Sequence, residues 1–155
     1  MKQGSFFEDE RPHPPARTFA FVANIDGGAR GNPGPAAYGV VIRNAKGEIV
    51  EKLGEYLGIQ TNNVAEYSGL VAALDYAERE KIGSLKILSD SELLVKQMRG
   101  QYKVKNPALR GLFDRAQAMV RRLQKFSIEH VMRESNKDAD RLVNQVLDSR
   151  ERGKH

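Results

Sequence analysis

Two patterns of apolar residues along this chain predict secondary structure: apolar runs rich in strand-forming residues, and apolar residues at helical spacing. Strand-forming runs cover Thr18–Ile25, Ala36–Asn44 and Glu48–Leu57, and the turn sequence Asn44-Ala45-Lys46-Gly47 predicts that the second and third form a β-hairpin. From Asn62 to Glu80 apolar residues recur instead at steps of three and four, which predicts a helix. The first half of the chain therefore predicts an antiparallel meander followed by a helix.

The second half predicts strands that are separated by helices. Short strands are expected over Ser84–Ser89 and Phe126–Met132, and helices over Ser91–Arg99, Asn106–Gln124 and Asn136–Arg150. Parallel strands separated by helices are joined by right-handed crossovers. The order of elements therefore predicts an α/β fold: one mixed five-stranded sheet, with three antiparallel strands and then parallel strands, flanked by helices.

The length and composition fit one domain. With 155 residues, 40% of them hydrophobic, the chain can bury a core. We expect a flexible N-terminal tail over residues 1–17, a folded domain over 18–150 and a C-terminal tail over 151–155. No run of eighteen apolar residues is present, so neither a transmembrane helix nor a membrane partner is expected. The first residues also lack the apolar stretch of a secretory signal.

The absence of cysteine restricts the chemistry that this chain can perform. It excludes disulfides, iron–sulfur clusters and a cysteine nucleophile, and it is consistent with a cytoplasmic protein. The three histidines are scattered and do not form a metal-binding pattern. Any bound metal must therefore take oxygen ligands, as Mg²⁺, Mn²⁺ and Ca²⁺ do.

The net charge of +5 is concentrated in one segment. Between Lys96 and Lys125 there are nine Lys or Arg and a single acid, Asp114, so this basic block carries +8 and the rest of the chain −3. Such a block suggests a surface that contacts a polyanion. A solvated helical face rich in Lys and Arg explains the same pattern, and the charge alone leaves both interpretations open.

Four acidic residues lie where a polar helix face or a turn does not readily account for them. Asp26 and Asp90 directly follow the first and fourth predicted strands, whose carboxyl ends would meet at one edge of the sheet. Glu66, expected in the first turn of its helix, and Asp140 lie in line with apolar residues, so both should point toward the sheet. Each alone has a structural explanation, as a turn former or as the partner of a helix terminus or an arginine. Together they would repel one another without a cation, and two Mg²⁺ ions about 3.5–4 Å apart would hold them with a phosphoryl group.

The segments that contain these acids resemble the motifs of a known family. They are Asp26–Gly39 (DGGARGNPGPAAYG), Thr61–Tyr67 (TNNVAEY), Ser89–Ser91 (SDS) and Asn136–Asn144 (NKDADRLVN). In this order they resemble the motifs of type 1 ribonuclease H, and the resemblance covers about residues 18–150. It implies the ribonuclease-H-like fold and an endonuclease that cuts the RNA strand of an RNA·DNA hybrid, leaving 5′-phosphate and 3′-hydroxyl ends. It also implies that Asp26, Glu66, Asp90 and Asp140 are catalytic and hold two Mg²⁺ ions, for which Mn²⁺ can substitute.

The resemblance further implies how the hybrid is bound. Asn32, Asn62 and Asn63 match positions that face the minor groove, and Thr61 of the same motif is also expected to bind the substrate. An amide can both donate to and accept from a 2′-hydroxyl, the group that distinguishes RNA from DNA. For Asn62 an alternative is that it only caps the helix that follows.

Other members of the family carry a Trp-rich basic protrusion that this chain lacks. It has no tryptophan, and its segment Gly100–Pro107 is short, so it resembles the compact branch of the family. Contacts with the hybrid are then expected around the helix Asn106–Gln124, from Lys103, Lys105, Arg110 and Arg121. Two residues are candidates for an auxiliary role: His130, which falls near the place of a catalytic histidine but within a predicted strand, and Arg133, which could reach a phosphate or be an ordinary surface arginine.

Three other functions compete with this interpretation. A ribonuclease-H-like binding module without turnover would be favoured by the loss of one acid, and none is missing. A related nuclease that acts on DNA, such as a junction resolvase, is disfavoured by the paired asparagines. An enzyme that also cuts double-stranded RNA fits the compact branch and remains an alternative. The protein itself is expected to be a monomer.

Overall fold

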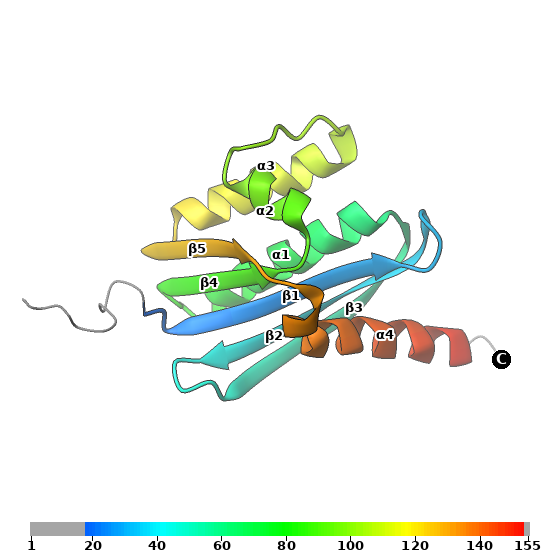
Figure 1. Cartoon of the computed structure of the whole chain (residues 1–155), viewed down its shortest axis with the longest axis horizontal. Coiled ribbons are helices and arrows are strands. Elements are labelled where there is room, and N and C mark those ends of the chain that lie inside the picture. The colour runs from blue at the N-terminus through cyan, green and yellow to red at the C-terminus, as the bar shows by residue number, and fades with distance from the viewer. Residues whose placement is uncertain (1–17, 154–155) are drawn as a thin grey trace, which may run out of the picture.

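The computed structural model describes residues 18–153 (Figure 1); the expected N-terminal tail and residues 154–155 lie outside this range. The strands are β1 (Phe21–Ala29), β2 (Gly34–Asn44), β3 (Ile49–Gln60), β4 (Ser84–Ser89) and β5 (Lys125–His130). The helices are α1 (Asn62–Arg79), α2 (Glu92–Met98), α3 (Pro107–Arg121) and α4 (Lys137–Arg152), with a 3₁₀ turn over Arg133–Ser135 before α4. The predicted order of strands and helices is confirmed. No helix in the described range is long and apolar enough to cross a membrane.

The strands form one mixed sheet in the order β3-β2-β1-β4-β5. β2 pairs antiparallel with β1 and β3, whereas β4 pairs parallel with β1 and β5. α1 and α3 lie on one face of the sheet and α4 lies on the other (Figure 1). The main core lies between the sheet and α1, α2 and α3, while a smaller apolar cluster of Ala37, Val143 and Leu147 lies under α4. The predicted α/β fold is therefore confirmed.

One predicted strand boundary is wrong in a way that matters for the acids. The first strand does not end at Ile25. Its parallel pairing with β4 stops there, but its antiparallel pairing with β2 continues to Ala29. Asp26 therefore lies within β1 instead of following it. Asp26 pairs with Gly39 of β2 but has no paired residue in β4, so a ligand can approach it from the β4 side.

Two boundaries near the C-terminus also differ from the prediction. β5 ends at His130 instead of Met132. α4 continues to Arg152, beyond the expected end of the domain at residue 150. The last turn of α4 is held by an ion pair at 2.9 Å between Glu151 and Arg30, which lies in the turn between β1 and β2. A contact between residues so far apart in the chain leaves no signal in local spacing.

Two glycines, in β1 and β2, allow helices to approach the sheet beside Asp26. A Cβ atom on Gly27 would lie 2.3 Å from the carbonyl carbon of Ala65 in α1, and one on Gly39 would lie 2.6 Å from the carbonyl oxygen of Ala139 in α4. These distances are too short for any side chain, so both positions require glycine. α1 and α4 therefore pack closely on opposite faces of the sheet at the level of Asp26, whose partner in β2 is Gly39.

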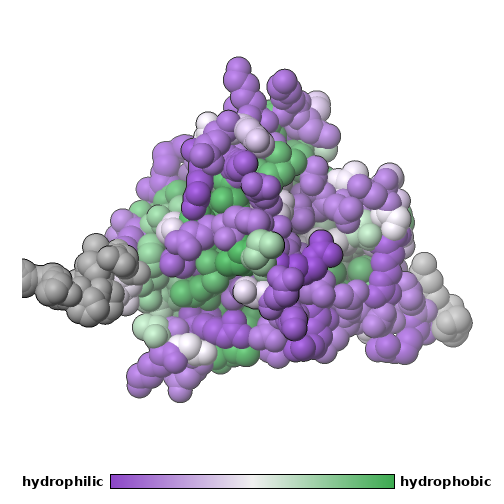
Figure 2. Space-filling view, in the orientation of Figure 1, coloured by the Kyte–Doolittle hydropathy of each residue, from purple (hydrophilic) through white to green (hydrophobic). Residues whose placement is uncertain are grey.

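The face of the sheet that carries α4 is only partly covered. Along β4, Leu85 and Ile87 are buried toward the main core, whereas Lys86 and Leu88 alternate with them and are partly exposed. Figure 2 shows hydrophobic side chains over the left part of the sheet, beyond α4, on an otherwise mostly hydrophilic face. α4 thus covers the end of the sheet where the acids lie and leaves the other end open.

Candidate active site

Three of the four acids meet at one end of the sheet. Carboxylate oxygens of Asp26, Glu66 and Asp90 lie within 4.8 Å of one another. The parallel pairing of β1 with β4 ends at Ile25 and Ser89, so the next residue in each strand direction is one of the two aspartates. Asp90 directly follows β4, as predicted, whereas Glu66 lies in the second turn of α1 and not in the first. The sheet therefore places two of the carboxylates, and α1 adds the third.

Asp140 joins this cluster from α4, on the other face of the sheet. It lies in the first turn of α4 and is exposed, and it is close enough to Asp26 to raise the pKa of that carboxyl group. All four acids line one cavity of about 300 Å³. Within residues 18–153, no ion pair includes any of the four. The four carboxylates therefore converge on one cavity, as predicted, and the exposed Asp140 lies at its rim.

Burial and mutual repulsion raise the pKa of two of these acids. Burial raises the pKa of Asp26 to about 8, and the negative charges of Asp90 and Asp140 act in the same direction. Burial likewise raises the pKa of Glu66 to about 7; a hydrogen bond from Ser91 opposes this rise. Near neutral pH the metal-free cluster therefore retains protons, which a bound cation would displace.

The residues of the cavity fit a divalent cation. All four candidate ligands are carboxylates, and hard cations such as Mg²⁺ and Mn²⁺ prefer oxygen ligands. Two arginines also line the cavity. Arg30 is held by Asp148 and Glu151 at 2.8 and 2.9 Å, so Arg133 is the one whose charge acts on Glu66. One arginine does not neutralise four carboxylates, and a cation would complete the balance of charge.

Asp90→Asn is expected to raise the melting temperature of the metal-free protein. The charge of Asp90 adds to burial in raising the pKa of Asp26 and Glu66. Both pKa values are raised above their ordinary values of 3.8 and 4.5, so these carboxyls favour folding when protonated and oppose it as pH rises through about 7 to 8. The increase in melting temperature that Asp90→Asn causes should therefore be small near about pH 5 and largest near about pH 8. Calorimetry in chelator at both pH values measures it, and an unchanged or lower melting temperature at the higher pH would contradict close clustering.

Thr61 and Asn62 have separate roles at the start of α1. Thr61 Oγ1 accepts a hydrogen bond at 3.2 Å from the N–H of Val64, so Thr61 is the helix cap. The alternative that Asn62 caps this helix is therefore wrong. Asn62 Oδ1 instead accepts a hydrogen bond at 2.8 Å from the N–H of Ala29, at the end of β1. Asn62 lines the acid cavity, whereas Thr61 does not.

Asn32 and Asn63 lie near the cavity without lining it. Asn32 Oδ1 accepts a hydrogen bond at 3.0 Å from the N–H of Asn62, which ties the turn after β1 to the start of α1. Both Asn32 and Asn63 are exposed. The structure therefore brings Asn32 and Asn62 into contact, as the motifs suggested, and leaves Asn63 on the adjacent surface.

Lys103 and Lys105 lie on the exposed segment between α2 and α3, away from the residues that line the acid cavity. Val104, between them, is buried, and Gln97 Nε2 donates to the carbonyl of Lys103 at 3.2 Å, so this segment is fixed to the core. Other members of the basic block have partners in the fold: Lys96, Arg110 and Arg122 form ion pairs with Glu92, Asp114 and Glu78, and Arg99 donates to the carbonyl of Ile128. Part of the block is therefore structural, and Lys103 and Lys105 remain its candidates for contact with a polyanion.

Of the two auxiliary candidates, only Arg133 lines the acid cavity. It belongs to the 3₁₀ turn before α4, and its charge opposes the rise in pKa that burial of Glu66 causes. His130 is the last residue of β5, where it pairs with Ser89 of β4, and its side chain is exposed. The predicted strand position of His130 is confirmed, and that position keeps it out of the lining of the cavity.

Sequence reasoning missed two residues that line the cavity, Arg30 and Asn144. Arg30 donates to Oδ1 of Asn144 at 3.1 Å and forms its ion pairs with Asp148 and Glu151. These three partners recur at steps of four and three along α4, so they share one face of that helix. This polar stripe is visible in the sequence, but nothing local indicates that an arginine from the turn between β1 and β2 lies on it.

Known proteins resemble this chain over most of its length. The sequence profile of a family described as reverse transcriptase-like matches residues 24–146. Ribonuclease HI of Halobacterium salinarum is 41% identical over 126 residues, which cover 81% of this chain and 63% of that protein. The bifunctional protein Rv2228c of Mycobacterium tuberculosis is 43% identical over 129 residues, 83% of this chain and 35% of that protein. The chain thus spans about a third of the length of the latter relative.

Solved structures extend this likeness to three dimensions. RNase H1 from Halobacterium salinarum has a TM-score of 0.80 at 40% identity, covering 83% of this chain and 98% of that one. The N-terminal RNase H domain of Rv2228c from Mycobacterium tuberculosis has a TM-score of 0.83 at 40% identity, with 88% and 99% covered. LC11-RNase H1, solved in complex with an RNA/DNA hybrid, has a TM-score of 0.79 at 41% identity, with 83% and 97% covered. Since the likeness spans nearly all of these domains and the segments that carry all four acids, this protein belongs to the type 1 ribonuclease H family.

Proposed function

We propose that this chain is a metal-dependent endonuclease that hydrolyses the RNA strand of RNA·DNA hybrids, leaving 5′-phosphate and 3′-hydroxyl ends. The observation that carries the proposal is the meeting of Asp26, Glu66 and Asp90 within 4.8 Å, in a cavity that Asp140 also lines. Membership of the ribonuclease H family supports this activity, and the hybrid bound to LC11-RNase H1 supports this substrate. We propose that the chain acts as a monomer.

The four acids are proposed to hold two Mg²⁺ ions, for which Mn²⁺ can substitute. When bound, such ions activate a water for attack on phosphorus and stabilise the leaving 3′-oxygen. The chain itself supplies rigid support for the carboxylates: Asp26 lies in β1, Asp90 directly follows the adjacent parallel strand β4, and Glu66 and Asp140 lie on helices that pack closely against the sheet. No side chain is required as a nucleophile.

Recognition of the RNA strand is assigned to polar groups beside the acids. Asn62 Oδ1 is bonded to Ala29, but its Nδ2 has no hydrogen-bond partner within residues 18–153 and is free to donate to a 2′-hydroxyl. Arg133, exposed at the rim of the cavity, is suited to a phosphate of the substrate. Asn32 supports this arrangement through its hydrogen bond with Asn62. Asn63, Lys103 and Lys105 would contact the hybrid farther from the reacting phosphate.

One assay tests the proposal against its competitors. Labelled RNA·DNA, RNA·RNA and DNA·DNA duplexes are each incubated with Mg²⁺, Mn²⁺ or chelator. We expect cleavage of the RNA strand of the hybrid, and only with a metal. Tight binding without cleavage would identify a binding module instead, and cleavage of DNA·DNA would identify a DNA nuclease. Cleavage of RNA·RNA as well would widen the substrate range without changing the chemistry.

Replacing Lys103 and Lys105 by alanine is expected to reduce the salt dependence of hybrid binding. Each lysine that contacts a phosphate contributes about −0.9 to the slope of log affinity against log salt for a B-form duplex, so the slope should flatten by up to about two units. Fluorescence anisotropy with labelled hybrid in chelator measures this slope. The matched control replaces Lys46 and Lys52, which lie on the β2–β3 hairpin, and should leave the slope unchanged. If the slope of log affinity against log salt is the same in both double variants, Lys103 and Lys105 do not contact the hybrid and belong to a solvated surface.

A further inference from the structure

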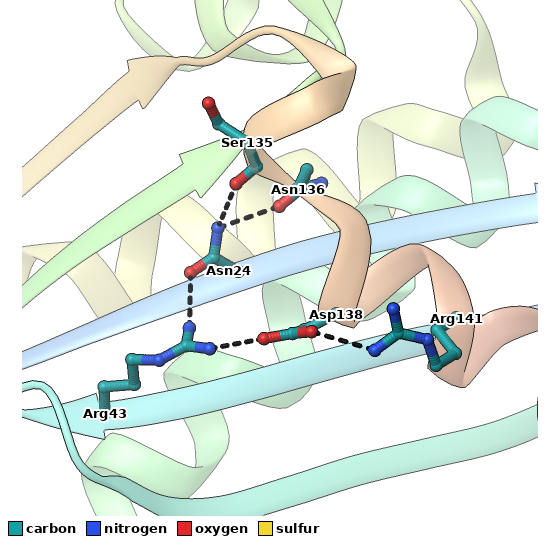
Figure 3. Close-up of polar contacts among 6 residues, drawn as sticks. All are labelled: Asn24, Arg43, Ser135, Asn136, Asp138 and Arg141. Carbon is teal, nitrogen blue, oxygen red and sulfur yellow. Dashed lines mark hydrogen bonds and ion pairs between the residues drawn. The ribbon is translucent and has the colours of Figure 1, made fainter.

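A buried chain of hydrogen bonds joins β1 to the start of α4 (Figure 3). Asn24 Nδ2 donates to Oδ1 of Asn136 at 2.9 Å and to the carbonyl of Ser135 at 3.4 Å. Asn136 Nδ2 in turn donates to the carbonyl of Ile25 at 2.9 Å. Asn24 is 6% exposed and Asn136 is 1% exposed. Two amides that are so well buried have lost their contacts with water and depend on these bonds.

The other side of the Asn24 amide is also occupied. Arg43 of β2 donates from one guanidinium nitrogen to Oδ1 of Asn24 at 3.2 Å and forms an ion pair from the other with Asp138 of α4. Asp138 also accepts a hydrogen bond from Arg141 at 3.1 Å, one turn further along α4 (Figure 3). The oxygen and the nitrogen of Asn24 therefore each have a partner, which fixes the orientation of the amide. An apolar side chain of the same size would fill the space and make none of these bonds.

This network contacts the backbone beside Asp26 and the backbone of Asp140. Ile25, whose carbonyl accepts from Asn136, directly precedes Asp26, and Asn24 shares a face of β1 with Asp26 because side chains alternate along a strand. Asn136 is the residue at the start of α4, yet its side chain makes no capping bond to the helix. Its carbonyl accepts a hydrogen bond at 3.1 Å from the N–H of Asp140. One residue, Asn136, therefore links the backbone beside Asp26 to the backbone of Asp140.

We propose that Asn24 and Asn136 are positioning residues that hold Asp140 against Asp26. This inference rests on the proposed function of the four acids as metal ligands. The apolar cluster of Ala37, Val143 and Leu147 anchors the middle of the helix, and the first turn of α4 packs on Gly39 of β2 through the backbone of Ala139. The Asn24–Asn136 bridge ties the same turn to β1 beside Asp26, so we expect the position of the Asp140 carboxylate to depend on it. Hydrogen bonds to groups around a metal site have this effect in general, and their loss weakens metal affinity or activity about 10- to 100-fold.

The test replaces Asn24 by leucine and measures Mn²⁺ binding to the free protein by titration calorimetry. Asn24→Leu is expected to weaken Mn²⁺ binding by about 10- to 100-fold. The matched control is Tyr67→Phe, which removes another buried hydrogen bond, from the Tyr67 hydroxyl to Gln97 Oε1 at 2.7 Å. It should lower the melting temperature and leave Mn²⁺ affinity unchanged. If both variants lose stability and neither loses Mn²⁺ affinity, the bridge is only structural and the inference is overturned.

A second pair of variants asks whether the effect passes through Asp140. In an Asp140→Asn background, Asn24→Leu should weaken Mn²⁺ binding by less than about twofold, because the ligand that the bridge positions has already been removed. If Asn24→Leu weakens Mn²⁺ binding equally with and without the Asp140 carboxylate, the inference is overturned. Should Asn24→Leu not fold, Asn24→Ala, which adds no volume, is interpreted in the same way. Cleavage of RNA·DNA hybrid by the unmodified protein is measured separately, so a failure of the proposed function is distinguished from a failure of the bridge.

Discussion

Asp90→Asn is expected to lower the rate of hybrid cleavage by roughly 10² to 10³ or more, the loss that follows when one preorganised electrostatic group is removed from an active site. The amide keeps the shape of the side chain and removes one of the three carboxylates that meet within 4.8 Å. Hybrid binding should survive, because loss of a negative charge does not weaken contact with a polyanion. Single-turnover cleavage with Mg²⁺ measures the rate, and anisotropy in chelator measures binding.

Two controls separate this effect from damage to the fold. Asp75→Asn makes the same chemical change on α1, where Asp75 forms an exposed ion pair with Arg79 away from the cavity, and should retain the original rate. The metal-free melting temperature of Asp90→Asn should rise, as argued above, so a loss of activity cannot be attributed to unfolding. Cleavage at the original rate by Asp90→Asn would refute the assignment of the metal site.

The second large effect is expected at Asn62. Asn62→Ala and Asn62→Asp should each lower kcat/KM for the hybrid, which corresponds to a loss of about 1–3 kcal/mol of transition-state stabilisation. Both variants remove the Nδ2 donor that is assigned to a 2′-hydroxyl. Only Asn62→Ala should also destabilise the fold, by up to about 1–3 kcal/mol, because it leaves the partly buried N–H of Ala29 without its acceptor. The aspartate retains an oxygen at that position. Steady-state kinetics and thermal unfolding of both variants measure the two losses.

The added charge of Asn62→Asp needs its own control, since it could repel the phosphates of the substrate. The matched comparison uses a second hybrid in which one 2′-hydroxyl at the cleavage site is replaced by hydrogen. If Asn62 contacts that hydroxyl, the variant and the modified substrate should not lose rate additively. Fully additive losses at every position, or efficient cleavage by Asn62→Asp, would remove Asn62 from recognition of the RNA strand.

Much of the fold was predictable because it follows from local spacing. Apolar runs rich in strand-forming residues identified the strands, apolar residues at steps of three and four identified the helices, and the turn at Asn44–Gly47 identified the hairpin. The cap at Asn106 with Pro107 after it marked the start of α3 correctly. Errors arose where pairing with another strand overrode local pattern, as in β1, which β2 extends past Ile25 to Ala29. Local sequence has no information on how far a neighbouring strand reaches.

The candidate site was likewise predictable only in part. By itself the sequence determined the family, the order of elements and the four acids, since each acid lies in a recognisable segment and three of the four lie at the expected end of a strand or the expected face of a helix. Only the tertiary structure decided which of them meet within 4.8 Å, that Thr61 and not Asn62 caps α1, and that Arg30 lies on α4. It also decided that Asn24 and Asn136 bond to each other.

The physical reason is that spacing indicates which face of an element a side chain occupies. Its partners are determined by the register of the sheet and by how closely the helices pack on it. Partners far apart in the chain, such as Asn24 and Asn136, become neighbours only when the whole domain has folded.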